Sequence, residues 1–219
     1  ALFLLYFILM FEALRLTTAL STSAIFTMMP LAAAAIDRAL FKRSSSALVW
    51  AALVIGAVGA LWVVFKGSWS AFAALSLGKG EVLFFIGTLS HAAYAVFVPR
   101  LRRGEPLYAT TLGVSIAGAV ILILCFWYKI AETNWLDLAI LIWGVLIYLA
   151  VFATLGTFAL LTFAASRLSS AKVTAYTYLT PMWVVLMESA LGNGYPALII
   201  LLGGIPIAMA LWLLFVEPS

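Results

Sequence analysis

Charge is scarce in this sequence. Only 9% of its 219 residues are Asp, Glu, Lys or Arg, whereas 66% are apolar. Soluble domains carry about 25% charged residues, so a chain with so few cannot cover the surface of a water-soluble globule. The scarcity of charge excludes an ordinary soluble domain.

Cysteine and histidine are nearly absent as well, with one residue of each. The single Cys125 excludes an internal disulfide and a cysteine-based metal site. No acidic cluster has metal-ligand spacing, and no GxxxxGK loop is present to bind nucleotide phosphates. We therefore expect no metal, no cofactor and no ATP-driven pumping by this chain alone. The basic residues form no tract, so we expect no nucleic-acid partner.

Long charge-free runs fill the space between the few charges. Six of them, at 16–36, 44–65, 82–99, 106–128, 138–166 and 189–216, are each at least 18 residues long. A membrane-spanning helix needs about 20 mostly apolar residues. Together with two shorter runs at 1–11 and 173–187, the six long runs predict an all-α polytopic bundle of eight spans. We place these spans at about 1–16, 18–40, 47–65, 80–98, 107–128, 136–161, 171–190 and 196–216.

The basic residues predict the orientation, because cytoplasmic loops of membrane proteins are enriched in Lys and Arg. Eight lie on one predicted side: Arg38, Lys42, Arg43, Arg100, Arg102, Arg103, Arg167 and Lys172. Four lie on the other: Arg15, Lys66, Lys79 and Lys129. We expect the first side, with both chain ends, to be cytoplasmic, in a multi-pass protein of a bacterial inner (plasma) membrane.

An internal repeat relates the two halves of the chain. Pro30 and Pro181 each follow a polar stretch, and an acid stands seven residues after each proline, at Asp37 and Glu188. The sequence LWVVF at 61–65 matches LWLLF at 211–215. These two segments are 150 residues apart in the sequence, and the two prolines are 151 residues apart. Related loops carry opposite charge patterns, which predicts that the two copies are inverted in the membrane, as is typical of secondary transporters.

The repeat also predicts the domain organisation. Residues 80–219 hold a complete second copy of five helices, whereas residues 1–66 hold only the last three helices of the first copy. The Gly- and Ser-containing stretch 67–79 is the expected linker between the copies. We therefore expect an intact protein of ten helices, with two more before Ala1.

These residues resemble a known family. Residues 13–65, which begin ALRLTTALSTSAIFTMMP, resemble the latter part of an EamA repeat, and residues 80–216, with GTLSHAAYAVFVPRLRR in the first helix, resemble a complete one. The chain is thus similar to the EamA branch of the drug/metabolite transporter superfamily. Family members carry Gly-Glu at the acidic turn, but these turns read Ile36-Asp37 and Met187-Glu188. The resemblance implies an exporter of small organic metabolites.

The prolines are the most specific candidates for a solute site. A proline inside a helix leaves the carbonyl four residues back without its hydrogen bond, here those of Phe26 and Thr177. Interrupted helices at matching positions of two repeats point to a transporter's binding site, although each proline alternatively only kinks a packed helix. The candidate substrate-binding residues are Thr27, Pro30, His91, Tyr94, Thr154, Thr177, Tyr178, Pro181 and Trp183.

His91 and Glu12 are the candidate proton-coupling groups. An ionisable side chain in the middle of a span is costly and by default suggests function, and His91 shares a helix face with Tyr94 and Gly87. The alternative for His91 is a hydrogen bond that holds two helices together. The alternative for Glu12 is an ion pair with Arg15 at the interface.

Together these patterns favour a secondary transporter, an exporter of amino-acid-like or amphipathic solutes that works by alternating access. Its expected partners are a small-molecule solute and membrane lipid, and its expected state is a monomer or homodimer. Two alternatives remain, an intramembrane enzyme that uses His91 and a non-transporting helical scaffold.

Overall fold

The computed structural model describes residues 2–42, 45–75, 78–101, 103–192 and 194–217, and all regular structure within these ranges is helical. The chain divides into a major unit, Leu2–Phe97 with Leu168–Ser219, and a minor unit, Val98–Arg167. The major unit contains α1 (Leu2–Leu14), α2 (Ala19–Phe26), α3 (Met29–Phe41), α4 (Ala47–Val64), α5 (Trp69–Ala73), most of α6 (Lys79–Leu101), α10 (Ser170–Ala175), η3 (Tyr176–Leu179), α11 (Thr180–Ala190), α12 (Leu198–Leu201) and α13 (Gly204–Val216).

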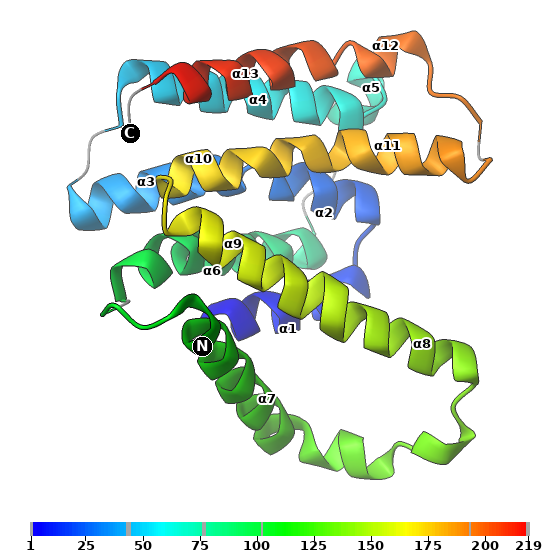
Figure 1. The fold of residues 1–219 in the computed structure, drawn as a ribbon. Helices are drawn as coiled ribbons and strands as arrows, with labels where there is room; N and C mark the ends of the chain where they lie inside the picture. The colour runs from blue at the N-terminus through cyan, green and yellow to red at the C-terminus, as the bar shows by residue number, and fades with distance from the viewer. Residues whose placement is uncertain (1, 43–44, 76–77, 102, 193, 218–219) are drawn as a thin grey trace. The chain divides into compact units, whose positions relative to one another are not determined.

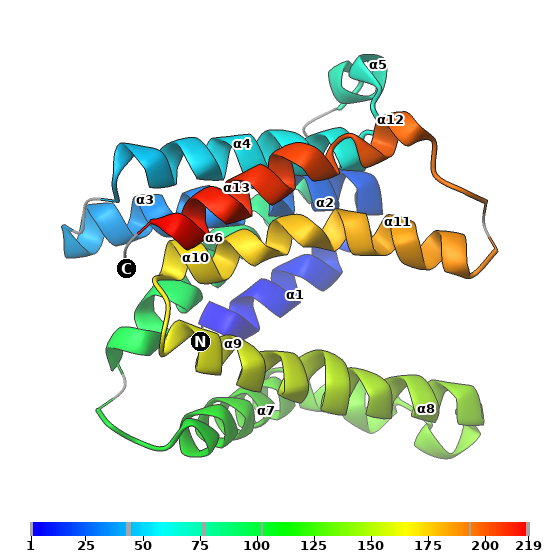
Figure 2. The ribbon, with the colours of Figure 1, turned by 45° about the horizontal axis from the view of Figure 1, so that its top comes forward.

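The tightest helix pair of the major unit is α4 with α13, which lie side by side in both views (Figures 1 and 2). Small residues allow this close approach. A Cβ atom placed on Gly59 would lie 2.7 Å from the carbonyl oxygen of Gly203, and one placed on Gly203 would lie 2.8 Å from that of Gly59. The two glycines thus permit direct backbone contact where α13 begins.

A second contact layer joins α3, α6 and α10. Met29 and Ala33 of α3 pack against Ala92 and Val96 of α6, and all four are almost fully buried. Every residue of α10 is buried, and this helix packs against α3. Because α3 belongs to the first predicted repeat and α10 to the second, the two copies meet along this layer.

Both proline-containing segments are interrupted helices, as the sequence predicts. The helix ends at Phe26 and begins again at Met29, and between them the amide of Met28 donates to the carbonyl of Ile25 at 3.0 Å. In the second copy, the 3₁₀ segment η3 separates α10 from α11. Each proline stands in the first turn of the helix that follows, where a missing N–H group costs nothing because that turn has no internal acceptor.

The minor unit consists of α7 (Leu107–Glu132), the 3₁₀ segment η1 (Trp135–Asp137), α8 (Ile140–Tyr148), the π-helical segment η2 (Leu149–Gly156) and α9 (Thr157–Ala165). Within it, α7 packs against α9, and non-helical dihedral angles at Phe126 bend α7. Large apolar side chains, from Leu112 to Phe152, are exposed along these helices. Such helices need an apolar surrounding, which a lipid bilayer provides.

The observed helices confirm the predicted polytopic bundle. Among the described residues, six helices are long and apolar enough to cross a membrane: Ser21–Phe41, Ala47–Val64, Lys79–Leu101, Tyr108–Glu132, Ile140–Ala165 and Leu198–Val216. The segments predicted at 1–16 and 171–190 are helical too, so the count of eight spans stays a prediction. The expected linker 67–79 is not entirely irregular, because Ser68 caps the short helix α5 through its side chain. Arg43 and Arg102, used for the orientation, lie outside the described residues.

The contact between α4 and α13 yields a stability prediction. We expect Gly59→Val to destabilise the protein by about 1–3 kcal/mol, the usual cost of overpacking, because the new side chain collides with the Gly203 backbone. Thermal unfolding in detergent measures the change. The control is Gly118→Ala in α7, where a Cβ meets no described atom within 4 Å; it should leave stability unchanged or raise it by up to about 1 kcal/mol. Equal effects of the two substitutions would contradict the packing described here.

Candidate solute cavity

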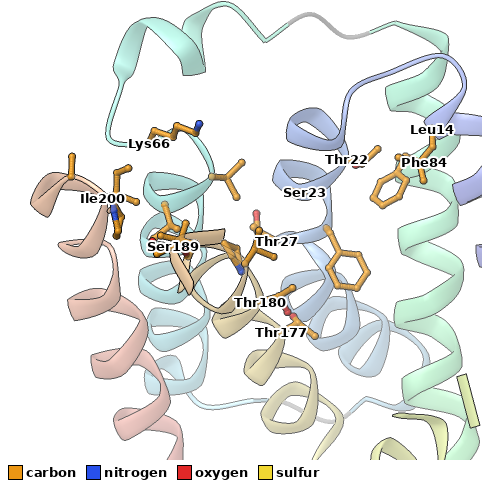
Figure 3. A pocket seen from close by; sticks show the side chains of 18 of the residues that line it. Leu14, Thr22, Ser23, Thr27, Lys66, Phe84, Thr177, Thr180, Ser189 and Ile200 are labelled. Atoms are coloured by element: carbon orange, nitrogen blue, oxygen red, sulfur yellow. Dashed lines mark hydrogen bonds between the residues drawn. The ribbon is translucent and has the colours of Figure 1, made fainter. Parts of the chain in front are cut away.

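A cavity of about 760 Å³ lies within the major unit. Its walls come from α1, α2, α4, α6, η3, α11 and the segment that leads into α12. Figure 3 shows the surrounding side chains, including Thr27 on the α2 side and Thr180 on the α11 side. Binding sites for small organic molecules usually enclose about 300–1,000 Å³, so the volume suits a small solute.

The two helix interruptions supply residues at equivalent positions. Phe26 stands four residues before Pro30 and Thr177 four residues before Pro181, and both line the cavity. In a membrane, backbone groups without an intrahelical partner persist only when they are buried in protein or face a water-filled cavity. In the structure the amide of Thr180 donates to the carbonyl of Thr177 at the end of η3, so the prediction that this carbonyl is left without a donor is wrong. The cavity adjoins both interruptions because Phe26, Thr177 and Thr180 line it.

Six serine and threonine side chains line the cavity: Thr22, Ser23, Thr27, Thr177, Thr180 and Ser189. The hydroxyl of Thr27 donates to the carbonyl of Ala24, and that of Thr177 donates to the carbonyl of Thr174, each at 2.7 Å. Because these hydroxyl protons point into their own helices, the oxygen lone pairs remain as acceptors. The cavity thus presents hydrogen-bond acceptors from both interrupted helices.

An aromatic wall closes one side of the cavity. Tyr6 of α1, Phe26 of α2 and Phe84 of α6 line it, and the Tyr6 ring lies 6.1 Å from that of Phe26 and 6.4 Å from that of Phe84. Such a surface contacts an apolar or aromatic part of a solute without requiring a hydrogen bond.

His91 lies against the same wall. Its ring centroid is 4.4 Å from that of Tyr6 and 6.0 Å from those of Phe3 and Phe26. Both ring nitrogens are buried, and neither has a hydrogen-bond partner among the described residues. A buried polar group left in this state needs an explanation. The alternative predicted for His91, a hydrogen bond that holds two helices together, does not form within the described part of the chain.

The structure places the sequence-predicted site residues in several settings. Thr27, Thr177 and Pro181 line the cavity. Tyr94 packs with Phe3 beside His91. Pro30 and Tyr178 are fully buried in the major unit.

Tyr178 has a defined structural contact, because its hydroxyl donates to the carbonyl of Leu53 at 2.9 Å and its ring fills the space above Gly56. Trp183 exposes 58% of its surface on α11. Thr154 belongs to η2 of the minor unit.

The acidic candidates differ in their surroundings. Glu12 forms the predicted ion pair with Arg15, with 3.3 Å between carboxylate oxygen and guanidinium nitrogen, at an exposed position. Glu188 lies in α11, but its side chain is outside the described part of the chain.

Glu81 is a buried acid that the sequence reasoning missed, because it stands two residues after Lys79, just before the charge-free run 82–99. Its carboxylate accepts hydrogen bonds from the Thr17 hydroxyl and from the amide of Gly78, the latter at 2.9 Å. The sequence does carry a signal for this arrangement. Gly78 directly precedes α6 and Glu81 is the third helical residue, the position from which a glutamate caps the helix start. Glu81 therefore joins the turn after α1 to the start of α6.

Comparison with known proteins relates the chain to one family and to two curated proteins. The model of a family described as EamA-like transporter family matches residues 78–216. Over 186 residues the chain is 24% identical to the Bacillus subtilis (strain 168) protein named Uncharacterized transporter YyaM, covering 84% of this chain and 61% of that protein. Over 187 residues it is 25% identical to Uncharacterized transporter sll0355 of Synechocystis sp. (strain ATCC 27184 / PCC 6803 / Kazusa), covering 80% of this chain and 56% of that protein.

The chain thus spans about three fifths of the length of these curated relatives. A solved crystal structure matches with a TM-score of 0.77 at 16% sequence identity, covering 95% of this chain and 71% of that one. At this identity the likeness shows a shared fold and nothing further.

Proposed function

Because the chain belongs to the EamA-like transporter family, we propose that the protein is a secondary transporter that exports a small organic solute across a bacterial inner membrane. The observation that carries this proposal is the position of the cavity. It is lined from both interrupted helices, at the equivalent residues Phe26 and Thr177. In secondary transporters of inverted-repeat architecture, broken helices at the repeat interface form the solute site.

The cavity supplies the contacts that an amphipathic solute needs. The aromatic wall of Tyr6, Phe26 and Phe84 faces the apolar part of the solute, and Thr27 and Thr177 offer hydroxyl oxygens to a polar group. Pro181 keeps the start of α11 free of a backbone donor. Solute binding in this proposal uses residues from both predicted repeats, so a movement of one repeat against the other changes the site.

Alternating access requires one end of the cavity to open while the other closes. Lys66 and Tyr195, at one end, are exposed. The count of basic residues assigns this end to the extracytoplasmic side. Toward the predicted cytoplasmic side, α3 and α10 pack together, and the buried Ser170 hydroxyl donates to the carbonyl of Ala95 at 3.3 Å. In our proposal, this packed layer separates when the site faces the cytoplasm. When the layer is closed again, the solute leaves at the opposite end of the cavity, past Lys66.

His91 is the proposed proton-coupling group. Its ring packs against Tyr6 and Phe26, which also line the cavity. A change in the protonation of the imidazole therefore affects a bound solute through these two aromatic rings. Imidazole changes its charge near neutral pH when it is not perturbed. Burial among aromatic rings disfavours the charged imidazolium, so in our proposal His91 takes up a proton only when the site opens to water during the transport cycle.

Filling the cavity tests the transport proposal. Val184 lines the cavity and exposes 50% of its surface, whereas Val58 of α4 exposes 57% and does not line it. We expect Val184→Trp to lower solute flux by at least about tenfold, because the indole occupies the volume of the solute and a clash of this kind costs more than 1.4 kcal/mol. Val58→Trp should retain flux. The measurement is uptake and efflux of a metabolite panel by the full-length protein in liposomes; no flux of any solute from the wild type would refute transport.

Replacing His91 tests the coupling. We expect His91→Phe to fold, because the ring is surrounded by aromatic side chains and phenylalanine removes two buried nitrogens that lack partners. The variant should keep downhill flux and lose the acceleration that a pH gradient gives to the wild type. Flux measured with and without an imposed gradient provides the readout. A wild type indifferent to the gradient, or a variant that keeps the full acceleration, would exclude coupling through His91.

A further inference from the structure

We propose that Lys66 is the anion-recognising group of the cavity, so that the transported solute is an amphipathic carboxylate. This inference rests on the proposed transport function and names the substrate class. The carboxylate would pair with the Lys66 ammonium at the open end, and the apolar body would lie against the aromatic wall of Tyr6, Phe26 and Phe84.

The backbone fixes the position of Lys66. The amide of Lys66 donates to the carbonyl of Val63 at 3.0 Å and the amide of Gly67 donates to that of Trp62 at 2.9 Å, the paired bonds of a Schellman cap at the end of α4. Lys66 itself has a φ of 53°. The cap holds the Cα–Cβ bond in a defined direction, and the side chain extends from the end of α4 over the cavity (Figure 3).

The residue type at this position is unexpected on structural grounds. The left-handed conformation at the end of a helix normally selects glycine, because a Cβ atom makes it unfavourable. Lys66 adopts this conformation nonetheless, and the conformation fixes the direction in which its side chain leaves the backbone. Lys42, after α3, has the same φ of 53° but does not line the cavity, so the two lysines form a matched pair.

The charge distribution around the cavity favours an anion. Among the side chains that the structure describes, Lys66 is the only charged one that lines the cavity. No hydrogen bond or ion pair of its ammonium is present among those residues. An ammonium carries three donors and no acceptor. The remaining polar side chains that line the cavity are uncharged, and a serine or threonine hydroxyl such as that of Ser23 or Thr180 is able to donate a hydrogen bond to a carboxylate.

A lipid phosphate at the membrane surface is the competing anion for Lys66, because long basic side chains reach toward the interface. The dependence of affinity on the ligand's charge and apolar body distinguishes the two anions. A solute carboxylate bound by Lys66 places its apolar body on Tyr6 and Phe84, so its affinity depends on both the charge and the size of that body. A headgroup contact depends on neither.

The test compares matched ligands that differ only in charge. Binding of 3-phenylpropionate, 3-phenylpropanamide and phenethylamine to the full-length protein is measured by calorimetry in a detergent without phosphate groups, with octanoate and octanamide as the aliphatic pair. We expect each carboxylate to bind about tenfold more tightly than its amide, a typical effect of a charge-assisted hydrogen bond. Lys66→Gln should remove this preference, and Lys66→Arg should keep it.

Two further variants separate recognition from folding. Lys66→Gly should not lower the melting temperature, because glycine suits the left-handed conformation, yet it should lose the preference for the carboxylate. Lys42→Gln, with the same backbone conformation outside the cavity, should leave the preference unchanged.

Several results would overturn the assignment. Equal affinity for carboxylate and amide, stronger binding of phenethylamine, or no binding of any carboxylate would each do so, as would a preference that survives in Lys66→Gln. A protein that moves solutes in liposomes without a carboxylate preference refutes the role of Lys66 and leaves transport standing. A protein that prefers carboxylates through Lys66 but moves no solute refutes transport instead.

Discussion

The structure depends on one constraint, which is that a backbone N–H or C=O group cannot be left without a partner in a bilayer. Each unsatisfied group costs several kcal/mol there, so a broken transmembrane helix requires either protein or water beside it. This chain breaks two helices, just before Pro30 and just before Pro181. The cavity lies between these two breaks, where hydroxyl side chains such as those of Thr27 and Thr177 line it, so the polar lining coincides with the interruptions.

The rest of the major unit supports this arrangement. Glycine contacts bring α4 against α13, and Tyr178, the residue after Thr177, anchors the second interruption through its hydrogen bond to Leu53. Alanines pack α3 against α6 and keep the first interruption in place. Closely packed surroundings thus hold the two short interruptions. In our proposal the transport cycle acts at these interruptions, because short 3₁₀ segments within helices commonly act as hinges.

Sequence reasoning predicted much of this arrangement because its main signals are local. Charge-free runs marked the helices, and the prolines marked both interruptions. The roles of Lys66 and Glu81 were not predicted, because one depends on a left-handed cap and the other on contact with Thr17 across the turn after α1. The aromatic surroundings of His91 were missed for the same reason. Phe3, Tyr6 and Phe26 are ordinary apolar residues in the sequence, and only tertiary packing gathers them around the imidazole.

Cysteine protection measures whether a solute occupies the cavity between the two interruptions, as we propose. Replacing the single Cys125 by serine gives a cysteine-free background. Cysteines are then introduced at Ser23 of α2 and Thr180 of α11, which line the cavity and are exposed, and at the exposed Thr133 as a control. We expect a transported solute to slow the labelling of both cavity cysteines by a water-soluble thiol reagent and to leave position 133 unaffected. Unchanged labelling at both cavity positions, with transport intact, would contradict it.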